Sequence, residues 1–210
     1  MMITSQQNQI NTTINGLFED SKFDMLNIMK GVAKSVFRPM QPLDFKDAYL
    51  SITKSQGKGL TNLIEDNKLK NIVEFGTSFG ISTLYLAQGV LETGGRVITT
   101  ELLESKAKKA INNFKSAGVH NLIDVRIGDA TETLKNHEEP IDLLLLDGWK
   151  DLYLTLFQML EPNFHNGTFI YVDNAEMADS KAFLEVISQN KAYKLQSLFG
   201  EKVVLITVKK

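Results

Sequence analysis

The chain of 210 residues contains no cysteine, which excludes disulfide bonds, thiolate metal sites and a cysteine nucleophile. Neither charge sign is in excess, because 23 Lys and Arg stand against 25 Asp and Glu. That balance gives no indication of a nucleic-acid partner. Apolar runs long enough to span a bilayer are missing, and the polar first fifteen residues do not have the pattern of a signal peptide. We therefore expect a soluble, cytoplasmic protein that does not bind a membrane.

Proline is also scarce, and two of the four prolines lie close together near residue 40, where they end an N-terminal helical pattern. Residues 1–13 are polar, and we expect them to be frayed. From Leu17 to the first proline, apolar residues recur at the three- and four-residue spacing of one or two amphipathic helices. A short helical piece is expected at 46–51. Residues 1–50 are thus predicted to be a helical segment that covers the substrate or contacts a second subunit.

From residue 51 to 210, strand-like apolar runs alternate with helical patterns. The expected strands are 72–75, 96–100, 122–127, 141–146, 168–172, 193–198 and 203–208. The expected helices are 56–67, 81–91, 105–117, a short one from 130, 152–160 and 181–188. This α/β alternation predicts a doubly wound, Rossmann-like, seven-stranded and mostly parallel sheet with helices on both faces. The last two strands form a hairpin that adds one antiparallel strand, and the very apolar run 141–146 belongs near the centre.

In such a sheet, ligands bind at the carboxyl ends of the strands, so the residues after each strand are the candidates. After the first strand, Gly76 and Gly80 flank a short loop that leads into a helix. Glycines let a backbone turn tightly or approach a ligand closely. The spacing differs from the three-glycine dinucleotide fingerprint, and a simple strand-to-helix turn explains the loop equally well.

Acidic residues follow the second and third strands. Glu101 can accept hydrogen bonds from both hydroxyls of a ribose, although an acid near a helix start also favours the helix dipole. Asp129 can accept a hydrogen bond from the exocyclic amine of an adenine, but it is equally a good N-cap for the helix that begins at Ala130. A nucleoside-containing ligand fits these two positions.

Two carboxylates and an amide follow the fourth and fifth strands, at Asp147, Asp173 and Asn174. Neighbouring strands bring these ends close together, and this oxygen-rich set suits a hard cation such as Mg²⁺. The alternative for each is turn or helix-cap chemistry.

Two other side chains near these positions have open roles. Lys150 lies three residues after Asp147, where a neutral amine can accept a proton. Trp149, the only tryptophan, either covers a bound adenosine or fills the core. Lys106, Lys108 and Lys109 are interpreted as a solvated helix face.

These residues together resemble a known family. The run 73–80 (Val-Glu-Phe-Gly-Thr-Ser-Phe-Gly), Glu101 and the run 128–130 (Gly-Asp-Ala) resemble class I S-adenosylmethionine-dependent methyltransferases. The run 147–150 (Asp-Gly-Trp-Lys) and the later Asp-Asn pair resemble the metal-dependent O-methyltransferases of the catechol and caffeoyl-CoA type. The similarity extends from about residue 50 to the C-terminus, which makes 51–210 the methyltransferase domain. The joint pattern of Asp, Lys three residues later and Asp-Asn is its more specific part.

The resemblance implies a role for each matching position. Those that it assigns to S-adenosylmethionine are Ile52, Glu74, Gly76, Thr77, Gly80, Ser82, Glu101, Asp129, Ala130, Asp147 and Trp149. It assigns Mg²⁺, or another divalent cation such as Mn²⁺ or Ca²⁺, to Asp147, Asp173 and Asn174, and the general base to Lys150. It further implies a homodimer and an acceptor that is a small aromatic with vicinal hydroxyls. Catechol enzymes usually have a histidine at Gly148, so part of the adenine packing is absent or supplied elsewhere.

Three alternatives stay open. A metal-independent methyltransferase would use Asp173 and Asn174 as turn residues only. A nucleotide-binding oxidoreductase is disfavoured by the missing third glycine. A cofactor-binding protein without catalysis would have no use for a chelating site.

Overall fold

The computed structural model describes residues 2–22, 24–36 and 38–209. Its centre is a seven-stranded sheet in the order β3-β2-β1-β4-β5-β7-β6. The strands are β1 (Asn71–Phe75), β2 (Arg96–Glu101), β3 (Ile123–Ile127), β4 (Ile141–Leu146), β5 (Phe164–Asp173), β6 (Tyr193–Leu198) and β7 (Val203–Val208). The first five strands pair in parallel, whereas β7 runs antiparallel to both β5 and β6. The predicted mostly parallel sheet with a closing hairpin is confirmed.

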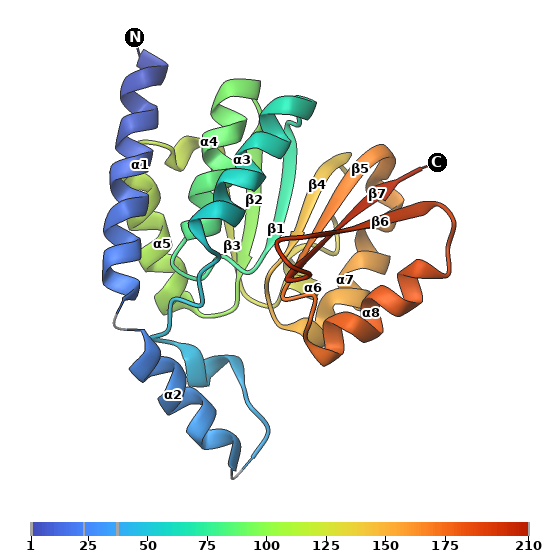
Figure 1. Cartoon of the computed structure of the whole chain (residues 1–210). Helices are drawn as coiled ribbons and strands as arrows, with labels where there is room; N and C mark the ends of the chain where they lie inside the picture. Colours follow the sequence, from blue (N-terminus) through green and yellow to red (C-terminus); the bar gives the residue numbers. More distant parts are fainter. Residues whose placement is uncertain (1, 23, 37, 210) are drawn as a thin grey trace.

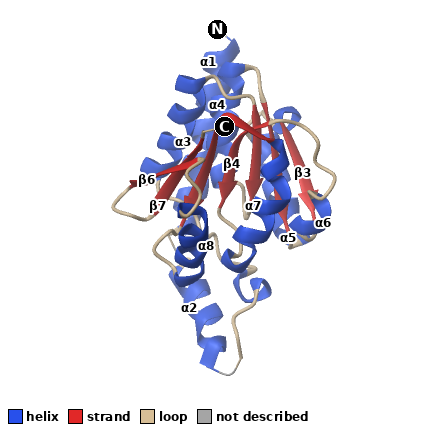
Figure 2. Cartoon of the chain, turned by 90° about the vertical axis from the view of Figure 1, so that its right-hand side faces the viewer, coloured by secondary structure: helices blue, strands red, loops and turns tan. Residues whose placement is uncertain are grey.

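Helices cover both faces of this sheet (Figures 1 and 2). One face carries α1 (Met2–Ser21), α3 (Lys54–Asn67), α4 (Ile81–Thr93) and α5 (Glu104–Ser116), whose apolar residues share one buried cluster. The other carries α6 (Ala130–Thr133), α7 (Tyr153–Leu160) and α8 (Ala178–Ser188), which share a second cluster. Within the described ranges, no helix combines the length and the apolar character needed to cross a membrane.

β4 lies between β1 and β5, and the side chains of Leu143 to Leu146 are fully buried, as its apolar sequence predicts. The chain adds β2 and β3 on one side of β1 and then returns to place β4 on the other side. Such a reversal leaves a crevice beyond the carboxyl ends of the strands. The ends of β1, β4 and β5 therefore meet at this crevice.

The N-terminus differs from the prediction, because α1 is a continuous helix that begins at Met2. Ile10, Ile14 and Leu17 recur at helical spacing and are buried against the core. Gln6 donates a hydrogen bond to the carbonyl of Gly118 at 2.6 Å. Burial along a narrow apolar stripe and polar anchoring thus stabilise a helix whose composition is mostly polar.

An arm made of α2 (Met25–Ala33), the 3₁₀ turns η1 (Lys34–Val36) and η2 (Pro42–Phe45), and their connections extends from the body of the molecule (Figure 1). The ring of Phe45 lies 6.5 Å from that of Trp149, so the arm reaches the loop after β4. Here the predicted helix at 46–51 is wrong, since this stretch is a turn followed by irregular chain in which Leu50 has a positive φ of 47°. Its backbone bonds to other elements instead: Asp24 accepts the N–H of Tyr49 at 2.6 Å.

The start of one strand also differs from the prediction. β5 begins at Phe164 rather than 168, and it pairs with Ile141 before an irregularity in the β4–β5 register. The His-Asn-Gly sequence at 165–167 is typical of a turn, and Gly167 does have a positive φ of 93°. The strand continues through this distortion, which the sequence pattern hides.

Candidate active site

The loop between β1 and α4 contains two glycines that its own surroundings require. Gly76 has φ of +109°, and a Cβ there would lie 2.7 Å from the carbonyl oxygen of Asp147. Gly80 has φ of +90°, and a Cβ there would lie 2.4 Å from the Phe114 ring. The atoms that exclude a side chain at these glycines, in Asp147 and Phe114, belong to the protein itself and not to a ligand. The glycines therefore allow the loop to pack against the chain after β4 and against α5, in addition to any ligand they face.

Beneath this loop, Glu74 is the centre of a buried hydroxyl network. Its Oε2 accepts hydrogen bonds from Thr83 at 2.5 Å and from Thr99 at 2.6 Å, and the hydroxyls of Thr77 and Thr99 are 2.5 Å apart. Burial raises the pKa of Glu74, while the hydroxyls of Ser82, Thr83 and Thr99 lower it. The other oxygen, Oε1, has no partner within the described part of the chain. Three predicted cofactor residues, Glu74, Thr77 and Ser82, thus share one network.

Glu101 ends β2 and faces the glycine loop. Its two oxygens accept the backbone N–H groups of Ser78 at 2.8 Å and Leu103 at 2.9 Å. Burial raises its pKa, and these N–H groups with Lys106 lower it. Each oxygen keeps a lone pair for a further donor, so the carboxylate is oriented and can still bind two hydroxyls.

Lys106 corrects the interpretation of its helix as a solvated face, because its exposed fraction is 5%. Its ammonium donates to the carbonyl of Ala48 at 2.8 Å and lies 5.2 Å from the centre of the Phe79 ring. Burial lowers the pKa of Lys106, and the charge of Glu101 raises it. The stretch that Lys106 contacts comes from 58 positions earlier, so helix periodicity alone could not reveal the burial.

The next strand end shows cap chemistry. Asp129 is exposed, and its Oδ1 accepts the backbone N–H of Thr131 at 2.8 Å as the N-cap of α6, while Ala130 is buried. The N–H of Gly128 donates to the carbonyl of Glu101 at 2.9 Å. The β3 end therefore lies beside the β2 end, as the nucleoside interpretation requires.

Asp147 and Asp173 end up side by side at the ends of β4 and β5. Each carboxyl group influences the pKa of the other, and both side chains are largely buried. Burial and then the charge of Asp173 raise the pKa of Asp147 well above its usual range, and burial raises that of Asp173. Asn174 follows in a left-handed conformation with φ of +52°. Two carboxylates that are close together and shielded from water are stable only if a cation or a proton lies between them.

The chemistry of these donors fits a divalent cation. Carboxylate and amide oxygens are the ligands that Mg²⁺ prefers, and the mutual repulsion of the two aspartates would be relieved by it. Among the described residues, no group of three or more His, Asp or Glu side chains could hold a metal. A protein-built cation site here would therefore rest on Asp147, Asp173 and the amide of Asn174.

Lys150 lies beside this pair. Its Nζ lies 3.9 Å from Oδ1 of Asp147 and donates to the carbonyl of Gly148 at 2.9 Å. It also lies 5.8 Å from the centre of the buried Tyr153 ring. The structure thus brings Lys150 to the same strand ends as the two aspartates.

The position of the absent histidine is filled by Phe75. A Cβ on Gly148 would lie 2.4 Å from the ring of Phe75, so the aromatic ring at the end of β1 occupies that space. Trp149 is half-buried, packs against the second core cluster and faces Phe45 of the arm. Ile52 is buried in the first cluster, directly before α3.

Sequence reasoning missed one polar residue at this site. Gln56, in the first turn of α3, donates a 2.7 Å hydrogen bond to Oδ1 of Asp173 across 117 positions of the chain. Only a weak signal was present: Thr53 and Gln56 have the spacing of a capping box.

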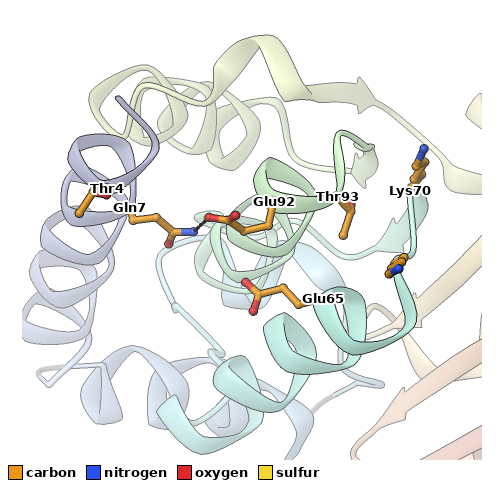
Figure 3. Close-up of a pocket in the computed structure, with 7 residues that line it drawn as sticks. Thr4, Gln7, Glu65, Lys70, Glu92 and Thr93 are labelled. Atoms are coloured by element: carbon orange, nitrogen blue, oxygen red, sulfur yellow. Dashed lines mark hydrogen bonds between the residues drawn. The ribbon is translucent and has the colours of Figure 1, made fainter. Parts of the chain in front are cut away.

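A separate hollow of about 800 Å³ lies near the start of β1, between α1, α3 and α4. Figure 3 shows that Gln7 and Glu92 meet there, with Glu65 beside them. It is at the opposite end of the sheet from the two aspartates and takes no part in their site.

The strand order, the closing antiparallel hairpin and an acid-lined site at the carboxyl edge define a Rossmann-like fold of the methyltransferase class. A crystal structure of an O-methyltransferase from Bacillus cereus in complex with SAH is similar, with a TM-score of 0.72 and 25% identity. The match covers 87% of this chain and 97% of that one. A structure of cofactor-bound Rv0187 from MTB matches with a TM-score of 0.69 and 24% identity, over 93% of this chain and 96% of that one.

The protein belongs to the O-methyltransferase family, since a family model of that description matches residues 33–198. A catechol O-methyltransferase of Niastella koreensis is 34% identical over 129 residues, which are 60% of this chain and 58% of that protein. A catechol O-methyltransferase of Mycobacterium tuberculosis is 32% identical over 126 residues, covering 60% and 57%. The chain therefore spans somewhat more than half the length of these relatives. The family predicted from the sequence is confirmed.

Proposed function

We propose that this protein transfers a methyl group from S-adenosylmethionine to one hydroxyl of a small aromatic with vicinal hydroxyls, assisted by a divalent cation. The observation that carries the proposal is the adjacent pair Asp147 and Asp173, with Lys150 beside it. A site with two buried carboxylates is unsuited to a neutral ligand alone. The names of the relatives, catechol O-methyltransferases, agree with this acceptor class.

In this proposal, S-adenosylmethionine would lie along the ends of β1, β2 and β3. Glu101 would accept the two ribose hydroxyls, because both of its oxygens are held by one N–H each and keep further capacity. The first turn of α4 begins at a glycine and has no side-chain cap, so its N–H groups remain available to the methionine carboxylate. The adenine would lie toward Asp129 and Trp149.

The acceptor would lie beside the ends of β4 and β5. When bound, a divalent cation supplies positive charge that favours the deprotonated hydroxyl. Asp147, Asp173 and Asn174 would hold it, and the Lys150 amine would take the hydroxyl proton. The acceptor oxygen then attacks the methyl carbon as the carbon–sulfur bond breaks, and S-adenosylhomocysteine leaves. Catalysis is mainly a matter of orientation and charge, because the methyl donor is already activated.

Residues 1–50 would complete the acceptor side and a homodimer contact. The apolar side chains of Met25, Leu26 and Met29 on α2 are 72%, 65% and 61% exposed, which is unusual for three neighbours on one helix. The arm that carries them already contacts Trp149 through Phe45. Sedimentation of the purified protein would show whether two copies associate.

The deciding experiment is a methyl-transfer assay on catechols, caffeoyl esters and hydroxylated flavonoids, each with Mg²⁺ and with EDTA. We expect turnover of vicinal diols only, lost in EDTA and restored by Mg²⁺ or Mn²⁺. Lys150→Arg keeps the charge but cannot accept a proton, so it should lower kcat by about a hundredfold or more. Full activity in EDTA would instead favour a metal-independent methyltransferase.

A further inference from the structure

The amide of Gln56 connects the start of α3 to one of the two site aspartates. Its Oε1 accepts hydrogen bonds from the backbone N–H and the hydroxyl of Thr53, both at 2.8 Å. Because two donors face this oxygen, the amide can be oriented only one way, with its nitrogen directed away from the helix cap. That nitrogen donates to Oδ1 of Asp173 at 2.7 Å.

The helix that carries Gln56 has little room to move. Gly57 follows it, and a Cβ at this glycine would lie 2.2 Å from the ring of Tyr85 on α4. The hydroxyl of Thr61 also donates to the carbonyl of Tyr85 at 2.9 Å. The first turn of α3 is thereby fixed on α4, and Gln56 is a rigid donor with an exposed fraction of 4%.

From this geometry we infer that Gln56 is a positioning residue for the cation and acceptor site, which acts by orienting the Asp173 carboxylate. The inference rests on the proposed metal-assisted function. The Gln56 amide engages one oxygen of Asp173, so the carboxylate cannot rotate freely and its other oxygen is presented to the ligand. Partners that orient a metal-binding carboxylate typically contribute about 10- to 100-fold to metal affinity.

The residue type agrees with this role. A glutamine donates to the carboxylate without adding charge, whereas a glutamate would place a third acid against Asp147 and Asp173 and would have no donor for Asp173. Because Gln56 lies four residues after Ile52, the same helix start also connects the aspartate to the segment expected to contact the cofactor. Gln56 would therefore hold the donor and acceptor sides in a fixed relation.

The test compares three variants of the full chain by calorimetric titration with Mg²⁺ and, separately, with S-adenosylhomocysteine. Gln56→Met keeps the length of the side chain and removes both hydrogen-bonding groups. Thr53→Ala removes the helix-cap hydroxyl and leaves the Gln56 amide. Gln88→Met makes the same chemical change on α4, where Gln88 binds Gln7 of α1 instead.

We expect Gln56→Met to weaken Mg²⁺ binding about tenfold or more and to raise the apparent Mg²⁺ KM equally, with S-adenosylhomocysteine affinity within threefold of wild type. Gln88→Met should keep wild-type Mg²⁺ affinity. Thr53→Ala should lower Tm through loss of the cap, and it should weaken Mg²⁺ binding less than Gln56→Met does, because the backbone N–H of residue 53 still donates to Oε1 of Gln56. Wild-type Mg²⁺ affinity in Gln56→Met, or equal loss for both ligands, would overturn the role of Gln56 alone. A wild-type protein that binds neither Mg²⁺ nor Mn²⁺ would overturn the metal-assisted function and this inference with it.

Discussion

At the scale of single residues, the side chain at the end of β1 occupies the space beside a glycine in the loop after β4. Phe75 fills the space that a side chain at Gly148 would need. The ring also packs edge-on against Tyr153, with ring centres 6.3 Å apart. The large side chain of Phe75 therefore requires a residue without a side chain at position 148.

This packing predicts strong coupling between the two positions. Gly148→Ala should destabilise the protein by about 1–3 kcal/mol, because its Cβ would overlap the Phe75 ring. Phe75→Leu should leave a small cavity, and the double variant should recover part of both losses, with a coupling of about 0.5–3 kcal/mol. Urea unfolding of the four proteins measures this cycle. If the losses of stability in the two single variants simply add in the double variant, the packing argument is wrong. Gly94→Ala is a control for backbone strain alone, because Gly94 has a positive φ but open space around its Cβ.

At the scale of elements, the arm is held to itself by one carboxylate. The Asp44 carboxylate accepts hydrogen bonds from two guanidinium nitrogens of Arg38, at 2.9 and 2.6 Å. It also accepts one from the backbone N–H of Gln41 at 3.0 Å. The arm also closes tightly, since a Cβ on Gly31 would lie 2.7 Å from the Phe45 ring. Phe45 in turn faces Trp149, so a change in the arm is reported by the only tryptophan in the chain.

Acid should therefore loosen the arm before the sheet unfolds. The hydrogen bond with Arg38 holds the pKa of Asp44 well below its usual 3.8. A lowered pKa means that the folded arm binds fewer protons than the unfolded chain, so its stabilisation is complete above about pH 3.8 and is lost as the pH falls toward the folded pKa. Trp149 fluorescence should then change at acid pH before the far-ultraviolet circular dichroism does.

Asp44→Asn should show the loosened fluorescence already at neutral pH and no separate acid transition. Asp47→Asn is the matched control, because Asp47 lies on the same arm with a side chain that is 61% exposed. If Asp44→Asn titrates like wild type, the carboxylate does not hold the arm.

The elements also show how far the sequence alone could lead. Every strand except β5 was predicted within one residue at each end, because runs such as 141–146 are continuous and apolar. α1 was missed since its buried stripe consists of a few isoleucine and leucine residues in a polar sequence. Burial of Lys106 and the contact of Gln56 with Asp173 depend on partners 58 and 117 positions away. No local pattern contains such contacts, whereas the strand-end acids could be found because parallel topology places them together.

At the scale of the whole molecule, the two site aspartates lie where the two halves of the sheet meet, and their mutual repulsion opposes folding. Asp147 directly follows β4, the strand next to β1, and Asp173 ends β5, the strand that pairs with the hairpin. When both carboxyl groups are ionised, their repulsion opposes the packing of β4 on β5, and Lys150 at 3.9 Å from Asp147 offsets it only in part. On the proposed metal-assisted function, a bound cation would relieve this repulsion, so we expect it to stabilise the fold.

Thermal unfolding should report this stabilisation. In EDTA, Asp147→Asn should raise Tm above wild type, because it removes one of two buried like charges. With Mg²⁺ at a hundred times its Kd, wild type should gain about 2.7 kcal/mol, which for a domain of this size corresponds to several degrees. Asp147→Asn should gain little, because one ligand is lost. Asp151→Asn, an exposed acid in the same loop, should behave as wild type in both buffers. A lower Tm for Asp147→Asn in EDTA, together with an unchanged response to Mg²⁺, would mean that the pair stabilises the fold through a shared proton and has no need of a cation.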